Sequence, residues 1–321
     1  MNRSHSSVLR LVVTAGLVVL LGGTVRAADD GHDLDRVDAA RRMQAAIDSG
    51  DLDTAARLAE EVAFAELVDY LDASYTVLRL HCQRKDEASA FATAEQMIDA
   101  GFWDFRRLMA DPDLTLVTST DRLKDLVHTV RVKRYLAALE RDSRDAMQHP
   151  DRIMATLAFE PGDVVADVGA GSGYFTVRVA RAVGATGKVI ATDIRQEMLD
   201  YIQARVAKQG LANVQLLKVE PTDPGLPAGS VDTVLMVDVI HYVKDRAGYA
   251  RKVRGALAPG GRLVVIDFRY DPEATREFAP PLEQQVPRET LDREMAEAGF
   301  EVAASYDFLP EQYFVVYRPA E

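Results

Sequence analysis

A run of small and apolar residues between positions 164 and 176 constrains this chain more than any other part of its sequence. It reads VVADVGAGSGYFT: apolar residues surround Asp167, and glycines follow at 169, 171 and 173. An apolar run, a glycine turn and a helical pattern predict a buried strand that ends just before a helix N-terminus. Glycine lets such a turn reach positive φ and lets a ligand approach closely. We therefore expect a ligand-binding turn, with a purely structural turn as the alternative.

The spacing of the glycines separates two kinds of nucleotide site. A dinucleotide-binding turn reads G-x-G-x-x-G and points the helix N-terminus at a pyrophosphate. Here the spacing is G-x-G-x-G, and Asp167 stands two residues before the first glycine. A carboxylate at that place suits a cationic or polar ligand better than a phosphate.

Strand-like runs alternate with helical stretches from residue 164 onward, as a parallel α/β sheet requires. The second run ends on Asp193, about 20 residues after the glycine turn, where a doubly wound fold places a carboxylate against ribose hydroxyls. Two further runs near the end of the chain predict a hairpin. The five alternating runs cover residues 164–168, 188–193, 213–218, 231–238 and 259–267, and the hairpin covers 300–308 and 312–317.

These motifs resemble those of class I S-adenosylmethionine-dependent methyltransferases, in the style of the small-molecule enzymes related to quinone C-methyltransferases. The resemblance covers residues 145–319 and rests on DVGAGSG, VIATDI, DTVLMVDVIHYV and LAPGGRLVVIDF, in the family's order and spacing. It implies a Rossmann-like, doubly wound α/β fold with a seven-stranded sheet, and S-adenosyl-L-methionine as cofactor. It also implies methyl transfer, on oxygen or carbon, to a small organic acceptor.

The resemblance also assigns site residues. The glycine turn would shape the pocket for the methionine part, Asp193 would accept hydrogen bonds from the ribose, and Ile194 would pack against the adenine. Asp223 would meet the adenine amino group, although its Thr-Asp-Pro loop departs from the family's Gly-Asp-Ala pattern. The full set implied for the cofactor is Asp167, Gly169, Ala170, Gly171, Gly173, Asp193, Ile194, Asp223 and Asp238.

His241 is the candidate catalytic residue. It stands three residues beyond Asp238 and beside Tyr242, just past the end of the fourth predicted strand. An imidazole there could take a proton from a hydroxyl nucleophile. Alternatively His241 and Tyr242 form the pocket wall, because a methyl sulfonium is already activated and the protein mainly aligns the reactants and excludes water. That chemistry needs no metal, and none is expected.

Charge and cysteine content exclude some functions. The formal net charge is −12, which disfavours a nucleic acid substrate on electrostatic grounds. Cys82 is the only cysteine, so neither an intramolecular disulfide nor a cysteine-based metal site can form. Its helical surroundings favour a buried structural thiol over a reactive one.

The first residues have the layout of a secretory signal peptide. Arg3 and Arg10 precede an uncharged apolar stretch at 11–21, and small residues at 25 and 27 suit a signal peptidase. We expect residues 1–27 to be a signal peptide that exports the protein, to the periplasm or outside the cell. The alternative is an uncleaved membrane anchor, for which the apolar stretch is short.

Residues 33–140 show helical patterns, and a weak similarity between 50–57 and 84–91 has the period of tetratricopeptide helix pairs. We expect an all-α, tetratricopeptide-like domain that either docks a protein partner or packs against the catalytic domain. Residues 141–152 read as a charged linker in which His149, before Pro150, is extended and the next helix can begin at Asp151. His149 and Arg152 either face the substrate or are solvated.

Two other functions stay open from the sequence. An NAD-dependent oxidoreductase fits Asp193 and the glycine turn but not the glycine spacing. An exported, non-catalytic binding or scaffold protein that keeps the fold fits the signal peptide, because S-adenosylmethionine is made in the cytosol. The sequence does not indicate an oligomeric state.

Overall fold

The computed structural model describes residues 32–321, except 50, 275 and 277. The predicted signal peptide at 1–27, and with it the alternative of a membrane anchor, lies outside the described residues. Within the described ranges, no helix is both long and apolar enough to cross a membrane.

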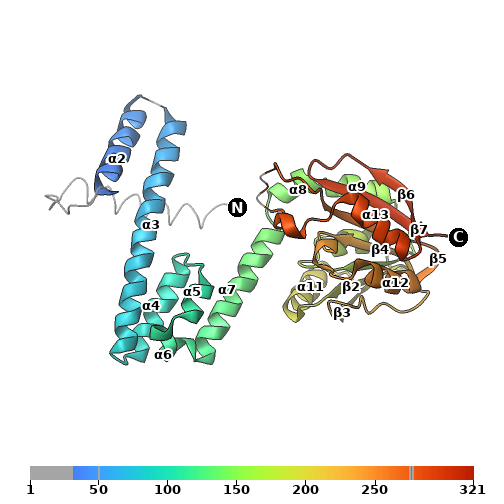
Figure 1. Cartoon of the computed structure of the whole chain (residues 1–321), viewed down its shortest axis with the longest axis horizontal. Helices are drawn as coiled ribbons and strands as arrows, with labels where there is room; N and C mark the ends of the chain where they lie inside the picture. The colour runs from blue at the N-terminus through green and yellow to red at the C-terminus, as the bar shows by residue number, and fades with distance from the viewer. Residues whose placement is uncertain (1–31, 50, 275, 277) are drawn as a thin grey trace. The chain divides into compact units, whose positions relative to one another are not determined.

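The chain divides into two compact units between Val130 and Arg131. The division falls inside one helix, α7 (Asp121–Leu139), and so lies before residue 140, where the sequence patterns placed the end of the helical region. Figure 1 shows the helical first unit in blue to green and the α/β second unit in green to red.

All the regular secondary structure in the described part of the first unit is helical. Asp51, Asp86 and Asp104 each cap a helix, because each carboxylate accepts a hydrogen bond from a backbone amide three residues on. The elements are α2 (His32–Ser49), α3 (Leu52–Gln83), α4 (Glu87–Asp99), α5 (Phe105–Ala110), η1 (Pro112–Leu114), α6 (Thr115–Thr118) and the start of α7.

The tetratricopeptide-like arrangement is not confirmed. The two similar sequence segments do both begin helices, at the caps Asp51 and Asp86. Between them, however, α3 runs unbroken over 32 residues, whereas a tetratricopeptide unit of similar length folds as a helix–turn–helix. Cys82 is buried in the core of this unit, and burial raises the pKa of its thiol, as expected for a structural cysteine.

The second unit is built on a seven-stranded sheet with the order β3-β2-β1-β4-β5-β7-β6. Strands β1 to β5 pair in parallel, and β7 lies antiparallel between β5 and β6. This confirms the predicted doubly wound sheet with its terminal hairpin. The strands are β1 (Val164–Val168), β2 (Lys188–Asp193), β3 (Val214–Lys218), β4 (Val231–Val237), β5 (Leu257–Phe268), β6 (Phe300–Tyr306) and β7 (Gln312–Pro319).

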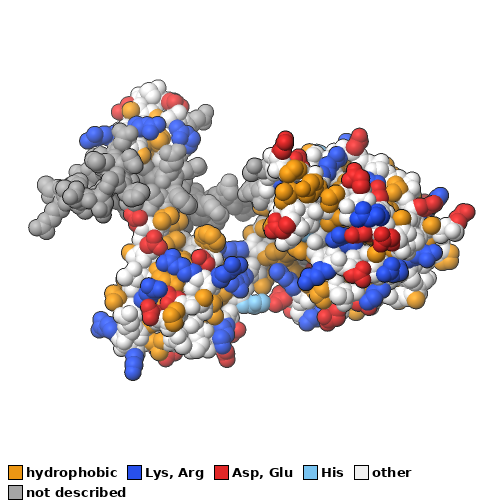
Figure 2. All heavy atoms as spheres, in the orientation of Figure 1, with side chains coloured by type: hydrophobic (Ala, Val, Ile, Leu, Met, Phe, Trp, Pro, Cys, Tyr) orange, Lys and Arg blue, Asp and Glu red, His pale blue; other side chains and the backbone are white. Residues whose placement is uncertain are grey.

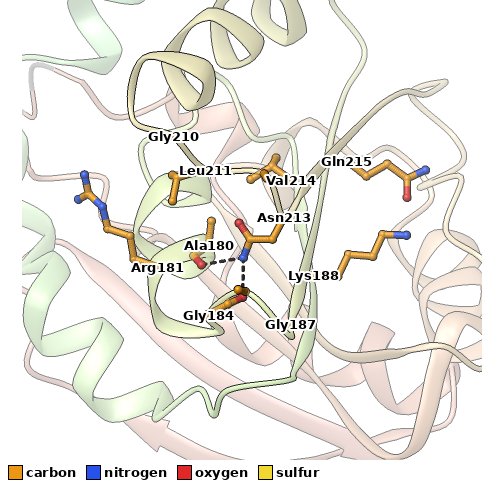
Figure 3. Close-up of a pocket in the computed structure, with 12 residues that line it drawn as sticks. Ala180, Arg181, Gly184, Gly187, Lys188, Gly210, Leu211, Asn213, Val214 and Gln215 are labelled. Atoms are coloured by element: carbon orange, nitrogen blue, oxygen red, sulfur yellow. Dashed lines mark hydrogen bonds between the residues drawn. The ribbon is translucent and has the colours of Figure 1, made fainter.

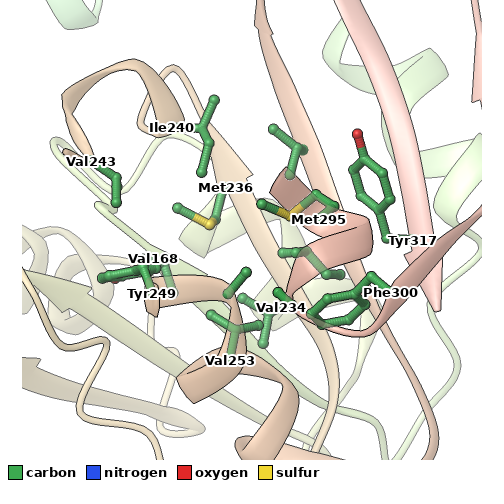
Figure 4. Close-up of a cluster of buried hydrophobic side chains, with 14 of the residues drawn as sticks. Val168, Val234, Met236, Ile240, Val243, Tyr249, Val253, Met295, Phe300 and Tyr317 are labelled. Atoms are coloured by element: carbon green, nitrogen blue, oxygen red, sulfur yellow. The ribbon is translucent and has the colours of Figure 1, made fainter. Parts of the chain in front are cut away.

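Helices cover both faces of the sheet, which explains why its central strands are apolar on both sides. On one face, α12 and α13 pack against the sheet, and Figure 4 shows Val253 of α12 and Met295 of α13 in one cluster with Val234 and Met236 of β4. Helices α9, α10 and α11 pack on the other face. The helices and short turns are α8 (Ser143–Gln148), α9 (Pro150–Leu157), α10 (Thr176–Ala182), α11 (Gln196–Lys208), η2 (Ile240–Tyr242), α12 (Arg246–Ala256), η3 (Leu282–Gln284) and α13 (Arg288–Glu297).

Residues 141–152 are not a linker. They form α8 and the start of α9, and His149 between them is left-handed, with φ 45° and ψ 56°, rather than extended. One left-handed residue serves both helices: its amide donates to the carbonyl of Asp145, and its carbonyl accepts from the amides of Arg152 and Ile153. The helix therefore begins at Pro150, where the missing amide proton of proline is not needed.

Acidic and basic side chains are interspersed over the visible face of the second unit (Figure 2). No single charged patch among the described residues of this face indicates a binding site, so we look for the site among the pockets of the surface.

Candidate active site

The carboxyl ends of strands β1 to β4 surround a pocket of about 260 Å³. In open α/β sheets, ligands bind at this edge. Four of the predicted site residues line it, namely Gly169, Asp193, Ile194 and Asp238. The other lining residues are Tyr135, Val168, Arg195, Val219, Glu220, Pro221, Val239, Tyr242, Val243 and Tyr249.

The glycine turn forms one wall of the pocket. Gly169 has a φ of 68°, and a side chain at Gly173, whose φ is 75°, would come within 3.0 Å of Ile202 on α11. Gly173 therefore allows close packing of two helices as well as the turn. Ala170 and Gly171 are buried; the amide of Ala170 donates to the carbonyl of Thr192 on the neighbouring strand.

Asp193 connects the end of β2 to the glycine turn. Its Oδ2 accepts a hydrogen bond of 3.0 Å from the amide of Gly171, and its Oδ1 accepts one of 2.9 Å from the amide of Arg195. Burial raises the pKa of this carboxyl group, and the backbone amides oppose that rise. Ile194, beside it, is half-exposed at the pocket. The carboxylate is thus oriented by backbone groups while it lines the pocket.

Asp167 has a different place from the one that the resemblance implied. It is buried beneath the turn, does not line the pocket, and accepts a hydrogen bond of 2.6 Å from Oγ1 of Thr176 at the start of α10. Burial raises the pKa of Asp167 to about 6. This carboxyl group supports the pocket from below by fixing the helix that follows the turn.

Asp238 follows β4 directly and is held in an unusual backbone conformation, with a φ of 57°. Its Oδ2 accepts a hydrogen bond of 2.8 Å from Nε2 of Gln148, and its Oδ1 accepts one from Nε2 of Gln312. Burial, and then the charge of Asp267, raise the pKa of Asp238 to about 6.

Asp223 is not in the pocket. Its carboxylate is half-exposed and forms an ion pair of 2.8 Å with Nζ of Lys252. Glu220, three residues earlier on the same loop, lines the pocket instead. The loop departs from the usual family pattern, so the local sequence could not show which of its acids points inward.

His241 does not line the pocket either. It is buried, and its Nδ1 lies 2.8 and 2.9 Å from the two carboxylate oxygens of buried Asp267 on β5. Its neighbour Tyr242 is 65% exposed and does line the pocket. The histidine thus attaches turn η2 to the sheet, and the tyrosine faces the ligand space.

Sequence reasoning missed Tyr135, which comes from α7, before the first strand. Its ring lines the pocket, and the guanidinium of Arg195 lies 4.3 Å from the ring centre. No motif surrounds Tyr135, so only its place in the fold identifies it. In contrast, His149 is exposed and Arg152 packs over the ring of Phe308, and neither residue lines the pocket.

A second hollow, of about 580 Å³, lies at the opposite edge of the sheet, around the starts of β2 and β3 (Figure 3). There Nδ2 of Asn213 donates to the carbonyl oxygens of Ala180 and Gly184, which joins the start of β3 to the end of α10. None of the predicted site residues lies in it. We therefore take the smaller pocket at the carboxyl edge as the candidate active site.

The chemistry of the smaller pocket fits the expected cofactor. Asp193, Glu220 and Asp238 supply carboxylates for hydroxyl and ammonium groups and for a sulfonium, and Ile194 with Tyr135 supplies apolar surface for a flat base. Among residues 32–321, apart from the three gaps, no cluster of three or more metal-binding side chains is found.

Known proteins share this domain. Residues 165–261 match the family described as "Methyltransferase domain". The ubiquinone/menaquinone biosynthesis C-methyltransferase of Ectopseudomonas mendocina is 28% identical over 169 residues, which are 44% of this chain and 66% of that protein. The enzyme of the same description from Marinomonas sp. is 32% identical over 108 residues, 33% of this chain and 43% of that protein. The chain thus spans two thirds or less of these two relatives.

A solved structure agrees. A SAM-dependent methyltransferase from Aquifex aeolicus is 26% identical, with a TM-score of 0.53, and the match covers 58% of this chain and 96% of that one. The antiparallel β7 also differs from the strand order 3-2-1-4-5-6 of dinucleotide-binding sheets, which argues against an oxidoreductase. The chain therefore contains a class I S-adenosylmethionine-dependent methyltransferase domain, with S-adenosyl-L-methionine as its cofactor.

Proposed function

We propose that this protein transfers a methyl group from S-adenosylmethionine to a small organic acceptor. The observation that carries the proposal is the pocket at the carboxyl edge of the sheet, lined by Asp193, Glu220 and Asp238 and walled by aromatic rings. When bound, the cofactor supplies an activated methyl group on a positively charged sulfonium.

The carboxylates of the pocket favour the methyl donor over its product. Coulombic attraction between unlike charges is stronger near a protein surface than in water. The demethylated product lacks the sulfonium charge, so three nearby carboxylates bind it less strongly than they bind the donor. Asp193 is held for this role by the amides of Gly171 and Arg195.

The acceptor side of the proposal rests on Tyr242 and on the relatives. Tyr242 offers an exposed ring at the pocket, on a turn attached to the sheet through His241 and Asp267. A ring of this kind suits a flat acceptor. Because the two relatives described above are C-methyltransferases of quinone biosynthesis, an electron-rich ring carbon is the first acceptor to test, and a ring hydroxyl is the second.

The test is a methylation assay with hydroquinones and phenols as acceptors and deuterated S-adenosylmethionine as donor. Mass spectrometry should show one labelled methyl group on the acceptor, and fragmentation should place it on carbon or oxygen. Titration calorimetry should show tighter binding of the donor than of its product. Absence of binding by both would refute the proposal. Asp223→Asn, which changes an acid outside the pocket, should bind the methyl donor as the parent protein does.

The alternative function is an exported, non-catalytic binding protein that keeps the fold. The signal-peptide pattern at 1–27 favours it, because the cofactor is made in the cytosol. Donor binding of normal strength with no methylation of any acceptor would support this alternative.

We also propose that the protein is exported through that signal. The apolar stretch at 11–21 and the small residues before Ala28 support this. Sequencing of the N-terminus of protein from native cells should find it near Ala28, whereas an N-terminus at Met1 would refute cleavage.

A further inference from the structure

We propose that Arg144 and Gln148, both on α8, are positioning residues that orient the carboxylate of Asp238 in the cofactor pocket. Helix α8 precedes the segment 165–261 that matches the methyltransferase family. The inference rests on the proposed cofactor site but not on the identity of the acceptor.

Asp238 needs outside support to keep its place. Its backbone is left-handed, which is uncommon for a residue other than glycine. It lines the pocket at the end of β4, and side-chain amides of Gln148 and Gln312 donate to its two oxygens. These donors come from α8 and β7, so two distant parts of the chain fix the direction of one carboxylate.

Gln148 can present only one end of its amide to Asp238. Its Oε1 accepts a hydrogen bond of 2.7 Å from Nε of Arg144, and its Nε2 donates one of 2.8 Å to Asp238. A guanidinium can donate hydrogen bonds but cannot accept them. The oxygen of Gln148 must therefore face Arg144, which leaves the NH₂ group for the carboxylate. Gln148 is fully buried, so bulk water does not compete for either contact.

Arg144 is itself held firmly. It is buried, and its Nη1 donates a hydrogen bond of 2.7 Å to the carbonyl of Leu139. Its guanidinium also lies 4.0 Å from the ring centre of Tyr174, in a cation–π contact. Tyr174 directly follows the glycine turn, so the same arginine contacts the turn and orients the amide that reaches Asp238.

Among the described residues, Gln312 has no hydrogen-bond donor at its amide oxygen, unlike Gln148. Its Oε1 is buried and has no hydrogen-bond partner within the described part of the chain. Asp238 alone selects the NH₂ end of Gln312, because an ionised carboxylate only accepts, and no second contact from the described residues holds the other end of that amide. Gln148, which is held at both ends of its amide, therefore makes the firmer of the two contacts that orient the carboxylate.

The groups that face Asp238 set the direction of a pH test. Asp267 on β5 disfavours its charge, whereas Arg144 on α8, His241 on η2 and Gln312 on β7 favour it. The amide of Gln148 also donates to the charged form. Removing the amide of Gln148 should raise the pKa of Asp238 further above its ordinary value. As the pH falls, binding of S-adenosylmethionine should therefore begin to weaken at a higher pH than in the parent protein.

The experiment is calorimetric titration of the full chain with S-adenosylmethionine between pH 5 and pH 8.5. Gln148→Met keeps the length of the side chain but cannot donate, and we expect roughly tenfold or greater loss of affinity at pH 7, with the acidic limb shifted to higher pH. Arg144→Met should also shift the acidic limb of the binding profile to higher pH. Gln209→Met is the matched control, because Gln209 also accepts from an arginine, Arg181, but lies on the surface away from the pocket.

Gln148→Glu provides a second variant of nearly the same shape, which still accepts from Arg144. At pH 8, where two carboxylates face each other, it should bind S-adenosylmethionine more weakly than the parent protein does. The difference from the parent should narrow as the pH falls and the pair of carboxyl groups takes up one proton. Parent affinity and an unchanged pH profile in Gln148→Met, or in Gln148→Glu if the first variant does not fold, would overturn the proposal. Failure of the parent protein to bind the donor would instead refute the cofactor site itself.

Discussion

The amide of Gly171 donates a hydrogen bond of 3.0 Å to Oδ2 of Asp193, 22 residues further along the chain. This bond joins the glycine turn after β1 to the carboxylate at the end of β2, the two features that most clearly indicate a nucleoside site in the sequence. Asp193 therefore has two functions: it lines the pocket and it steadies the wall beside it.

Replacing Asp193 should weaken cofactor binding. Asp193→Ala removes a buried charged acceptor, and we expect S-adenosylmethionine to bind more weakly by about 1.5–3 kcal/mol. Calorimetry measures the change, and circular dichroism checks that the turn still folds. Asp193→Asn keeps one acceptor oxygen and should lose less. An unchanged affinity in Asp193→Ala would mean that the ribose is held elsewhere.

The acids of the loop after β3 should differ in effect. Glu220→Ala should weaken donor binding several-fold, because Glu220 lines the pocket, whereas Asp223→Ala should leave it unchanged. Asp223 pairs with Lys252 at the surface, and losing such a pair costs less than about 1 kcal/mol of stability. Side-by-side titrations of the two variants test this. The reverse order of effects would restore Asp223 as the adenine contact.

His241→Asn should lower kcat by about tenfold or less, chiefly with a higher KM for the acceptor. Asparagine can still donate to Asp267, so turn η2 should keep Tyr242 at the pocket. Loss of a general base would instead lower kcat by roughly 10²–10⁴-fold. Steady-state kinetics with the acceptor found in the methylation assay distinguishes the two, and a loss in the larger range with normal donor affinity would show that His241 is a base.

Asp167→Asn should change how stability depends on pH. The pKa of Asp167 is about 6 in the folded chain and 3.8 ordinarily, so the folded state binds this proton more tightly. Its contribution to stability therefore falls as the pH rises from about 4 to 6 and then stays constant. Between pH 5 and pH 8 the parent should lose about 1–2 kcal/mol of unfolding free energy that the variant keeps.

Urea unfolding at the two pH values measures that difference. Asparagine preserves an acceptor for Thr176, so the hydrogen bond to α10 can persist in the variant. An equal pH dependence in the two proteins would show that Asp167 does not carry this effect.

The sequence by itself determined the sheet and the edge at which the site lies. Apolar runs separated by helical patterns specify parallel strands through local backbone preferences, and the end of each run places its last acid at the carboxyl edge. Asp193 and Asp238 were located in this way, and both line the pocket. The glycine spacing predicted the turn for the same reason, since positive φ is a local requirement.

Only the tertiary structure decided which side chains face the ligand. Tyr135 lines the pocket and Gln148 donates to Asp238, both from helices that precede the first strand. Asp167 lies beneath the glycine turn, and His241 contacts Asp267. The partners lie at separations of 9 residues for Asp167 and Thr176, 26 for His241 and Asp267, and 90 for Gln148 and Asp238. Local patterns encode backbone conformation, but the direction of a side chain is set by packing and hydrogen bonds with groups that only folding brings together.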